Sequence, residues 1–228
     1  MTRTEYLKDL IKPLPGAKWS KYPAGNIMQM WGENPSLYSG VFNQIDDLHK
    51  YLAGHSGIDI ATFHRDPVYA CQVGYVQRIR TDRLTLGGLC VYIQSPELED
   101  GNDRVIIQHV YAHLDECVVK EGDYITRGQL IGYEGNTGFV ISNGSPFWGT
   151  APAGVGTHLH FGLYEFIFKN NAWVGRNNQV LQYSFDPLPW LTDPDPTDDK
   201  IEGDWSGTLS LLKNMASFLE YLKKKYFP

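Results

Sequence analysis

The pattern of apolar and polar positions separates a central β-rich region from two different ends of the chain. In residues 26–190, short alternating or β-branched runs are divided by glycine, proline and asparagine, and helical periodicity is almost absent. This pattern predicts a mainly β domain, built as an antiparallel β-sandwich or a partly open barrel. The clearest predicted strands are residues 67–71, 75–80, 89–94, 104–114, 129–133 and 158–168.

The two ends of the chain carry other patterns. Residues 1–25 mix charges with prolines and glycines, which predicts a short helix followed by an irregular arm. Residues 191–204 are rich in aspartate and predict a solvated acidic linker. Residues 205–228 repeat apolar residues at three- and four-residue steps, which predicts one amphipathic helix. We expect that helix either to dock on the β-domain or to mediate self-association, with binding to a membrane surface as a third alternative.

Charge and cysteine content remove several classes of function. The net charge is −6 and the pI is about 5.6, so the chain as a whole offers no electrostatic basis for binding nucleic acid or anionic polymers. Its cysteines show no C-x-x-C spacing, which argues against a cysteine-ligated zinc site and a disulfide framework. The amino terminus lacks the apolar run of a signal peptide, and no segment reaches the length of a transmembrane helix.

His55 and Asp59 form the first of three local patterns that could carry chemistry. In a straight strand, residues four apart lie about 13 Å from each other, whereas two ligands of one zinc ion bring their tips within about 3 to 4 Å. The chain must therefore bend between them, and Gly57 allows such a bend. The spacing alone is weak, because an ordinary surface turn also produces it.

His158 and His160 form the second pattern, since they flank Leu159 in an apolar predicted strand. The period of two places both imidazoles on one face of that strand. The strand follows a glycine-rich segment, residues 137–156, which we expect to be a long functional loop. Two histidines on a solvated face are the alternative, but an H-x-H at this place favours metal chemistry.

His113 forms the third pattern, in the predicted strand 104–114. Alternation along a strand would place it on the same face as Tyr111 and His109. A histidine in the core or at a sheet edge is the ordinary interpretation of any one of these positions. Only the two other patterns make His113 a candidate for catalysis.

Together the patterns hold the groups that a catalytic zinc site needs. Two imidazoles and one carboxylate leave one coordination position open for water, as in catalytic rather than structural zinc sites. Such a site lowers the pKa of the bound water to about 7. The two remaining histidines could orient the water, accept its proton and stabilise the oxyanion. Spacing alone does not decide whether His158 or His160 is the ligand.

With their surrounding turns, these residues resemble the LytM/lysostaphin-type metallopeptidases, peptidase family M23, which hydrolyse peptidoglycan. The resemblance covers most of the chain, about residues 32–188. The motifs that carry it are the H-x-x-x-D of His55 and Asp59, Pro67-Val68-Tyr69-Ala70, Tyr111-Ala112-His113-Leu114, Asn136-Thr137-Gly138 and Thr157-His158-Leu159-His160-Phe161.

The resemblance implies both a fold and an activity. It implies a compact antiparallel β-domain with its site in an open groove, and one zinc ion bound by His55, Asp59 and His160. It further implies that His113 and His158 are catalytic. The expected activity is that of a zinc-dependent endopeptidase that cleaves peptidoglycan peptides, in the stem peptide or the cross-bridge. We expect action on the cell wall, and the absence of a recognisable signal peptide favours a phage-associated lysin.

Two alternatives belong to other classes of protein. A non-catalytic LytM-like regulatory or binding module would share the fold, but its usual sign is the loss of ligands, and none is lost here. Residues 119–129 carry a turn pattern that is also found in lipoyl-type carriers and sugar-phosphotransferase domains. A carrier would need a lysine exposed at a hairpin tip, and a phosphotransferase would not need Asp59.

Overall fold

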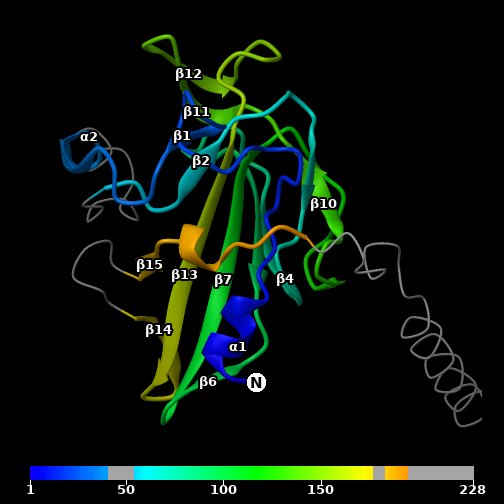
Figure 1. Cartoon of the computed structure of the whole chain (residues 1–228), viewed down its shortest axis with the longest axis vertical. Coiled ribbons are helices and arrows are strands. Elements are labelled where there is room, and N and C mark those ends of the chain that lie inside the picture. Colours follow the sequence, from blue (N-terminus) through cyan, green and yellow to red (C-terminus); the bar gives the residue numbers. More distant parts are fainter. Residues whose placement is uncertain (41–53, 177–182, 195–228) are drawn as a thin grey trace, which may run out of the picture. The chain divides into compact units, whose positions relative to one another are not determined.

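The computed structural model describes residues 1–40, 54–176 and 183–194, and antiparallel strands dominate these ranges (Figure 1). The main sheet contains β1 (Ile27–Gln29), β2 (Ile58–Ile60), β4 (Gly74–Arg80), β5 (Leu89–Gln94), β6 (Leu98–Asp100), β7 (Asp103–Leu114), β9 (Tyr124–Ile125), β13 (Leu159–Lys169), β14 (Ala172–Gly175) and β15 (Ser184–Phe185). A smaller sheet contains β3 (Pro67–Tyr69), β8 (Glu116–Cys117) and β10 (Leu130–Tyr133). The mainly β, antiparallel class predicted from the sequence is confirmed.

The main sheet is open rather than closed into a barrel. Its strands follow the order β1-β2-β13-β7-β5-β4-β9, and among the described residues β1 and β9 do not pair with each other. Val68 of β3 and Ile131 of β10 share one hydrophobic core with Val91, Tyr111 and Phe161 of the main sheet. The barrel form of the prediction is therefore wrong, because the small sheet covers the core without closing the large one.

The long strands β7 and β13 form the centre of the sheet and run side by side (Figure 1). Their pairing is continuous from His160 opposite Ala112 to Ile167 opposite Val105. Along β13, every second side chain from Leu159 onward is buried, so the intervening side chains face the other side of the sheet. The alternation that the sequence displays therefore fixes which face of β13 carries His160.

The amino-terminal segment begins with a short helix, as predicted. Helix α1 (Arg3–Lys8) starts at Thr2, whose hydroxyl accepts the Glu5 N–H in a capping box. Its Tyr6 and Leu7 are fully buried, and Arg3 forms a 2.9 Å ion pair with Glu165 of β13. The described residues also contain a second short helix, α2 (Pro35–Gly40), and a 3-10 turn, Leu188–Trp190. Residues 1–194 form one compact unit.

Six strands predicted from the sequence are confirmed, but one predicted loop is wrong. Residues 137–156 begin with a hairpin, β11 (Thr137–Ser142) and β12 (Ser145–Thr150), whose strands pair from end to end. Asn143 and Gly144 form its two-residue turn with φ angles of 49° and 77°. Asn-Gly is the preferred pair for such a turn, so the sequence carried a hairpin signal that the glycine count obscured.

Other predictions concern residues that the structure does not describe. The predicted helix at 205–228 and residues 195–204 of the predicted acidic linker lie outside the described ranges. The proposed domain boundaries, 1–25, 26–190, 191–204 and 205–228, stay predictions. Among the described helices, none has the length and apolar character needed to cross a membrane.

Candidate metal centre

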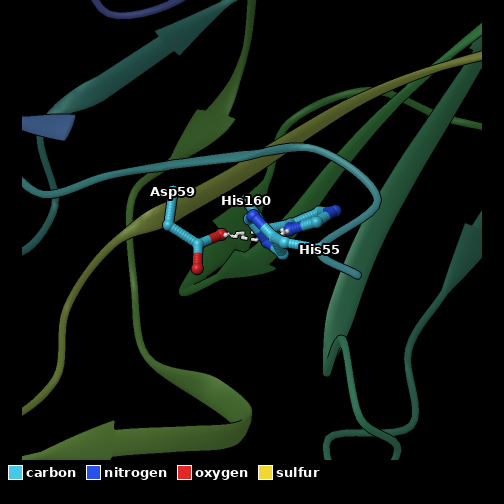
Figure 2. Close-up of side chains that lie close together, drawn as sticks. All are labelled: His55, Asp59 and His160. Carbon is cyan, nitrogen blue, oxygen red and sulfur yellow. Dashed lines mark hydrogen bonds and ion pairs between the residues drawn. The ribbon is translucent and has the colours of Figure 1, made fainter. Parts of the chain in front are cut away.

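Three side chains converge at one end of β13 (Figure 2). His55 precedes β2, Asp59 lies in β2, and His160 lies in β13. Strands β2 and β13 are antiparallel, and their register places Asp59 directly opposite His160. Since opposite residues of paired strands bring their side chains onto one face, a carboxylate and an imidazole are juxtaposed by strand pairing alone.

The three donor atoms form a triangle of nearly equal sides. His55 Nε2 lies 2.9 Å from His160 Nδ1 and 3.1 Å from Asp59 Oδ1. His160 Nδ1 lies 3.0 Å from the same Asp59 oxygen. Donors bound tetrahedrally to zinc at about 2 Å stand about 3.3 Å apart, so this triangle matches one face of such a site within a few tenths of an ångström. Two imidazoles and a carboxylate are also donors that zinc prefers.

Gly57 has a steric role that the sequence did not reveal. A Cβ atom at this position would lie 2.4 Å from the Phe161 carbonyl oxygen and 2.9 Å from both Cε1 and Nε2 of His160. The turn between His55 and Asp59 therefore runs so close to β13 that only hydrogen fits there. The predicted bend is present, and the same glycine also lets the His160 ring lie against the backbone.

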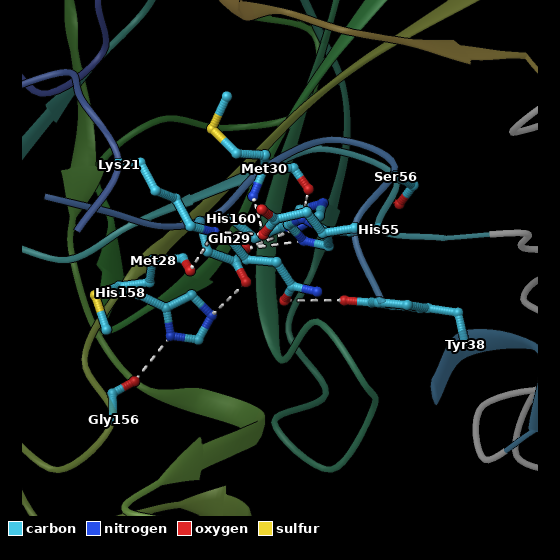
Figure 3. A network of polar contacts seen from close by, with 12 residues as sticks. Lys21, Met28, Gln29, Met30, Tyr38, His55, Ser56, Gly156, His158 and His160 are labelled. Carbon is cyan, nitrogen blue, oxygen red and sulfur yellow. Dashed lines mark hydrogen bonds and ion pairs between the residues drawn. The ribbon is translucent and has the colours of Figure 1, made fainter. Parts of the chain in front are cut away.

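His55 is oriented by the segment before α2 (Figure 3). Its Nδ1 lies 3.2 Å from the Met30 carbonyl oxygen, and its backbone N–H donates to the Glu33 carbonyl at 2.9 Å. The Glu33 carboxylate in turn accepts the Met30 N–H at 2.9 Å and pairs with Lys21. An Nδ1–H that donates to Met30 leaves Nε2 as the lone-pair nitrogen, which is the atom in the triangle.

His113 and His158 lie beside the triangle with their rings close together. Their ring centroids are 4.4 Å apart, and the His113 centroid is 6.3 Å from that of His160. His113 Nδ1 lies 2.7 Å from the Thr137 carbonyl oxygen, and His158 Nδ1 lies 2.8 Å from that of Gly156. Each ring therefore donates from Nδ1 to a backbone carbonyl and keeps its Nε2 for other partners. The structure brings together all five residues that the resemblance selected.

The prediction that His113 shares one face of its strand with Tyr111 and His109 is wrong. Tyr111 and His109 are fully buried, and the His109 ring packs against Tyr6. His113 lines the groove instead, together with its neighbour Ala112. The reason is backbone geometry. His113 has a φ of 62°, in the left-handed region, and this interrupts the alternation of side chains near the end of β7.

Burial and neighbouring charges set the ionisation of these side chains. Burial would raise the pKa of Asp59, but His55, His158 and His160 around it hold that pKa well below its usual range. Burial lowers the pKa of His113 to about 3 and also lowers the pKa of His160. An ionised carboxylate beside neutral imidazoles is the protonation state in which all three donors can bind a cation.

The five side chains open into a groove of about 690 Å³. Its walls include Tyr38 of α2, Tyr164 of β13 and the hairpin residues Phe139 and Val140. The Tyr38 ring lies 5.6 Å from the His55 ring, and the Tyr164 hydroxyl donates to Ser56 at 2.9 Å. Sequence reasoning missed both tyrosines, because nothing in their spacing distinguishes them from core aromatics.

Residues 53–175 match the model of peptidase family M23, which is more than half of the chain, and the chain therefore belongs to this family. Over 114 residues it is 34% identical to the peptidoglycan DD-endopeptidase ShyA of Vibrio cholerae, a match that covers 50% of this chain and 21% of ShyA. Over 81 residues it is 35% identical to lysostaphin of Staphylococcus simulans, covering 36% of this chain and 11% of lysostaphin. The matched segments thus span about a fifth or less of these relatives.

A solved structure described as LytU is 28% identical to this chain. The alignment covers 76% of this chain and 90% of LytU, with a TM-score of 0.43.

Proposed function

We propose that the chain is a zinc-dependent endopeptidase that hydrolyses peptide bonds of bacterial peptidoglycan, in the stem peptide or the cross-bridge, and that it acts on the cell wall. The observation that carries the proposal is the triangle of His55, Asp59 and His160 donor atoms, with sides of 2.9 to 3.1 Å, open to a groove. Membership of peptidase family M23 supports the reaction class. The similarity to ShyA, a peptidoglycan DD-endopeptidase, supports the substrate.

In this proposal His55, Asp59 and His160 hold one zinc ion. When bound, zinc polarises a peptide carbonyl and lowers the pKa of a bound water. Asp59 contributes the negative charge of the site, and the hydrogen bond from His55 Nδ1 to Met30 keeps that ring in the ligand tautomer. The low pKa of Asp59 keeps its carboxylate free of protons across the physiological range.

His113 and His158 act on the substrate and the attacking water. Both rings donate from Nδ1 to backbone carbonyls, so each Nε2 offers a lone pair to a water molecule. In that position His113 orients the water as a hydrogen-bond acceptor, and His158 takes up its proton at Nε2. The protonated ring then donates a hydrogen bond to the oxyanion or to the leaving amine.

The alternative of a non-catalytic module is not favoured. Such a module has no need for an open triangle of metal donors or for two additional oriented histidines. All five side chains are present, lie close to one another and line the same groove. The complete constellation supports catalysis instead.

Asp59→Ala and His160→Ala test the proposal. The unsubstituted chain should bind one zinc ion and release soluble peptides from purified peptidoglycan, whereas each variant should lose at least about a hundredfold in activity, because it lacks one of three ligands. Metal analysis and mass spectrometry of the released muropeptides measure both effects. His64→Ala is the matched control, since that histidine does not line the groove. Hydrolysis by the ligand variants at the rate of the unsubstituted chain would refute the proposal.

A further inference from the structure

Two arginines line the groove at a distance from the metal centre. Arg78 and Arg80 belong to β4, and among the described residues the charged groups that line the groove, histidines aside, are these two and Asp59. In the proposed function Asp59 is engaged at the metal centre. The remaining charge of the groove is then positive and is located on β4.

A β-bulge directs these arginines into the groove. In the pairing of β4 with β5, Val76 is opposite Ile93 and Arg78 is opposite Tyr92, so Gln77 is an extra residue. Strict alternation would place Arg78 on the same face as Val76, which is buried in the core. The bulge turns Arg78 and Arg80 to the groove face and leaves Ile79 packed on the core.

Strand register relates Arg80 to the metal centre. Arg80 is opposite Cys90 on β5, and Ala112 of β7 is opposite His160 of β13. Three strand spacings, from β13 through β7 and β5 to β4, amount to about 14 Å. The small side chains of Cys90 on β5 and Ala112 on β7, the two intervening strands, also line the groove. An extended peptide of about four residues has this length, so its backbone could reach from the catalytic histidines to Arg80.

The two groove arginines differ from the other arginines of the chain. Arg3, Arg65, Arg104, Arg127 and Arg176 pair with carboxylates, and Arg83 donates to the Asp115 carbonyl. Within the described ranges, the side chains of Arg78 and Arg80 have no hydrogen-bond or ion-pair partner, while their backbones pair with β5. Arg80 lies over the Tyr92 ring at 5.9 Å, a contact that orients the guanidinium without neutralising it. Both groups are therefore available to a ligand.

We propose that Arg78 and Arg80 form a subsite that binds a carboxylate of the peptide substrate, about four residues or fewer from the bond that is cleaved. The inference rests on the proposed function, since it takes the ligand to be a peptide lying along the groove. A guanidinium presents two parallel N–H groups that match the two oxygens of a carboxylate. The subsite would select peptides with a free carboxyl group over the same peptides with a carboxamide.

The test compares muropeptides in two forms, with free carboxyl groups and with the same groups converted to carboxamides. Calorimetry measures their affinity for the full-length, zinc-loaded His113→Ala protein, which is designed to bind peptide without turnover. We expect the carboxylate form to bind about tenfold more tightly. In the same background, Arg78→Gln with Arg80→Gln should abolish that preference. Lys120→Gln with Lys169→Gln removes the same charge at two exposed positions outside the groove and should retain it.

Each outcome decides the inference. Equal affinity for the two forms in the His113→Ala background would overturn it, as would a preference that survives the loss of both arginines. Cleavage of the same muropeptides by the unsubstituted chain is measured separately. If the unsubstituted chain does not cleave the muropeptides but the binding preference still depends on the two arginines, the proposed function is contradicted and the carboxylate subsite is supported.

Discussion

At the scale of single residues, the candidate metal centre depends on side chains whose positions are set by very close backbone contacts. Gly57 is the clearest example, because its missing Cβ leaves room for the His160 ring and the Phe161 carbonyl. Asp59 depends on its neighbours in another way, since three imidazoles keep it ionised in spite of burial. Small changes at either position should therefore affect metal binding.

Gly57→Ala tests this dependence. The added methyl group would meet backbone oxygen and the imidazole within 3 Å, so the free energy of unfolding should fall by about 1 to 3 kcal/mol and zinc affinity should fall with it. Denaturant unfolding of the metal-free protein and zinc titration measure the two effects. Gly16→Ala is the matched control, because no atom lies within 4 Å of its Cβ position. Equal zinc affinity in both variants would show that the close approach has no bearing on the site.

At the scale of secondary-structure elements, the hairpin β11–β12 positions one of the two additional histidines. Thr137, the first residue of β11, accepts the Leu89 N–H at 2.9 Å and donates its hydroxyl to the Leu114 carbonyl at 2.8 Å. Its own carbonyl oxygen accepts the hydrogen bond from His113 Nδ1. The beginning of β5, the end of β7 and the His113 ring are thus joined through one residue.

Thr137→Val should weaken that junction while keeping the shape of the side chain. It leaves a buried N–H and a buried carbonyl without partners, which should lower the free energy of unfolding by about 1 to 3 kcal/mol. Because His113 is not a proposed ligand, kcat should fall while zinc stoichiometry stays at one per chain. Thr126→Val, at an exposed turn, is the control. If Thr137→Val loses zinc while the molecules that still hold zinc keep the kcat of the unsubstituted chain, the assignment of His113 to catalysis rather than to zinc binding is contradicted.

Sequence periodicity predicted the elements well where alternation is regular and failed where the backbone departs from it. The faces of Leu159 and His160 in β13 follow from a period of two. The left-handed φ of His113 and the bulge at Gln77 each shift the phase of a strand by one residue, and no residue type marks them. The choice of His160 as the predicted ligand came from the resemblance to the family, since spacing left His158 equally eligible.

At the scale of the whole described molecule, a buried carboxyl group ties the small sheet to the segment that leaves β2. Glu134 follows β10, is fully buried and accepts the Thr62 N–H at 3.1 Å and the Thr62 hydroxyl. Its backbone N–H donates to the Asp66 carbonyl at 2.8 Å. Burial raises the pKa of Glu134 to about 7, against the opposing effect of the Thr62 hydrogen bonds.

This raised pKa predicts a pH dependence of global stability. The folded chain binds the Glu134 proton more tightly than the unfolded chain, so the stabilisation is present below pH 4.5 and is lost as the pH rises through about 7. The loss should amount to about 3 kcal/mol in the free energy of unfolding. Glu134→Gln should remove this component, which denaturant unfolding of the metal-free protein at several pH values would measure. Glu99→Gln, which removes an exposed carboxyl group, is the control. If Glu134→Gln and the unsubstituted chain show the same dependence of stability on pH, the pH dependence does not come from Glu134.

The pairing of Asp59 with His160 has a consequence for the newly made chain. The two residues are 101 positions apart, and β2 reaches β13 through only three residue pairs. A slip of that short strand by a single position would turn the carboxylate to the opposite side of the sheet. In the proposed function, hydrolysis therefore requires that these three residue pairs form in the correct register.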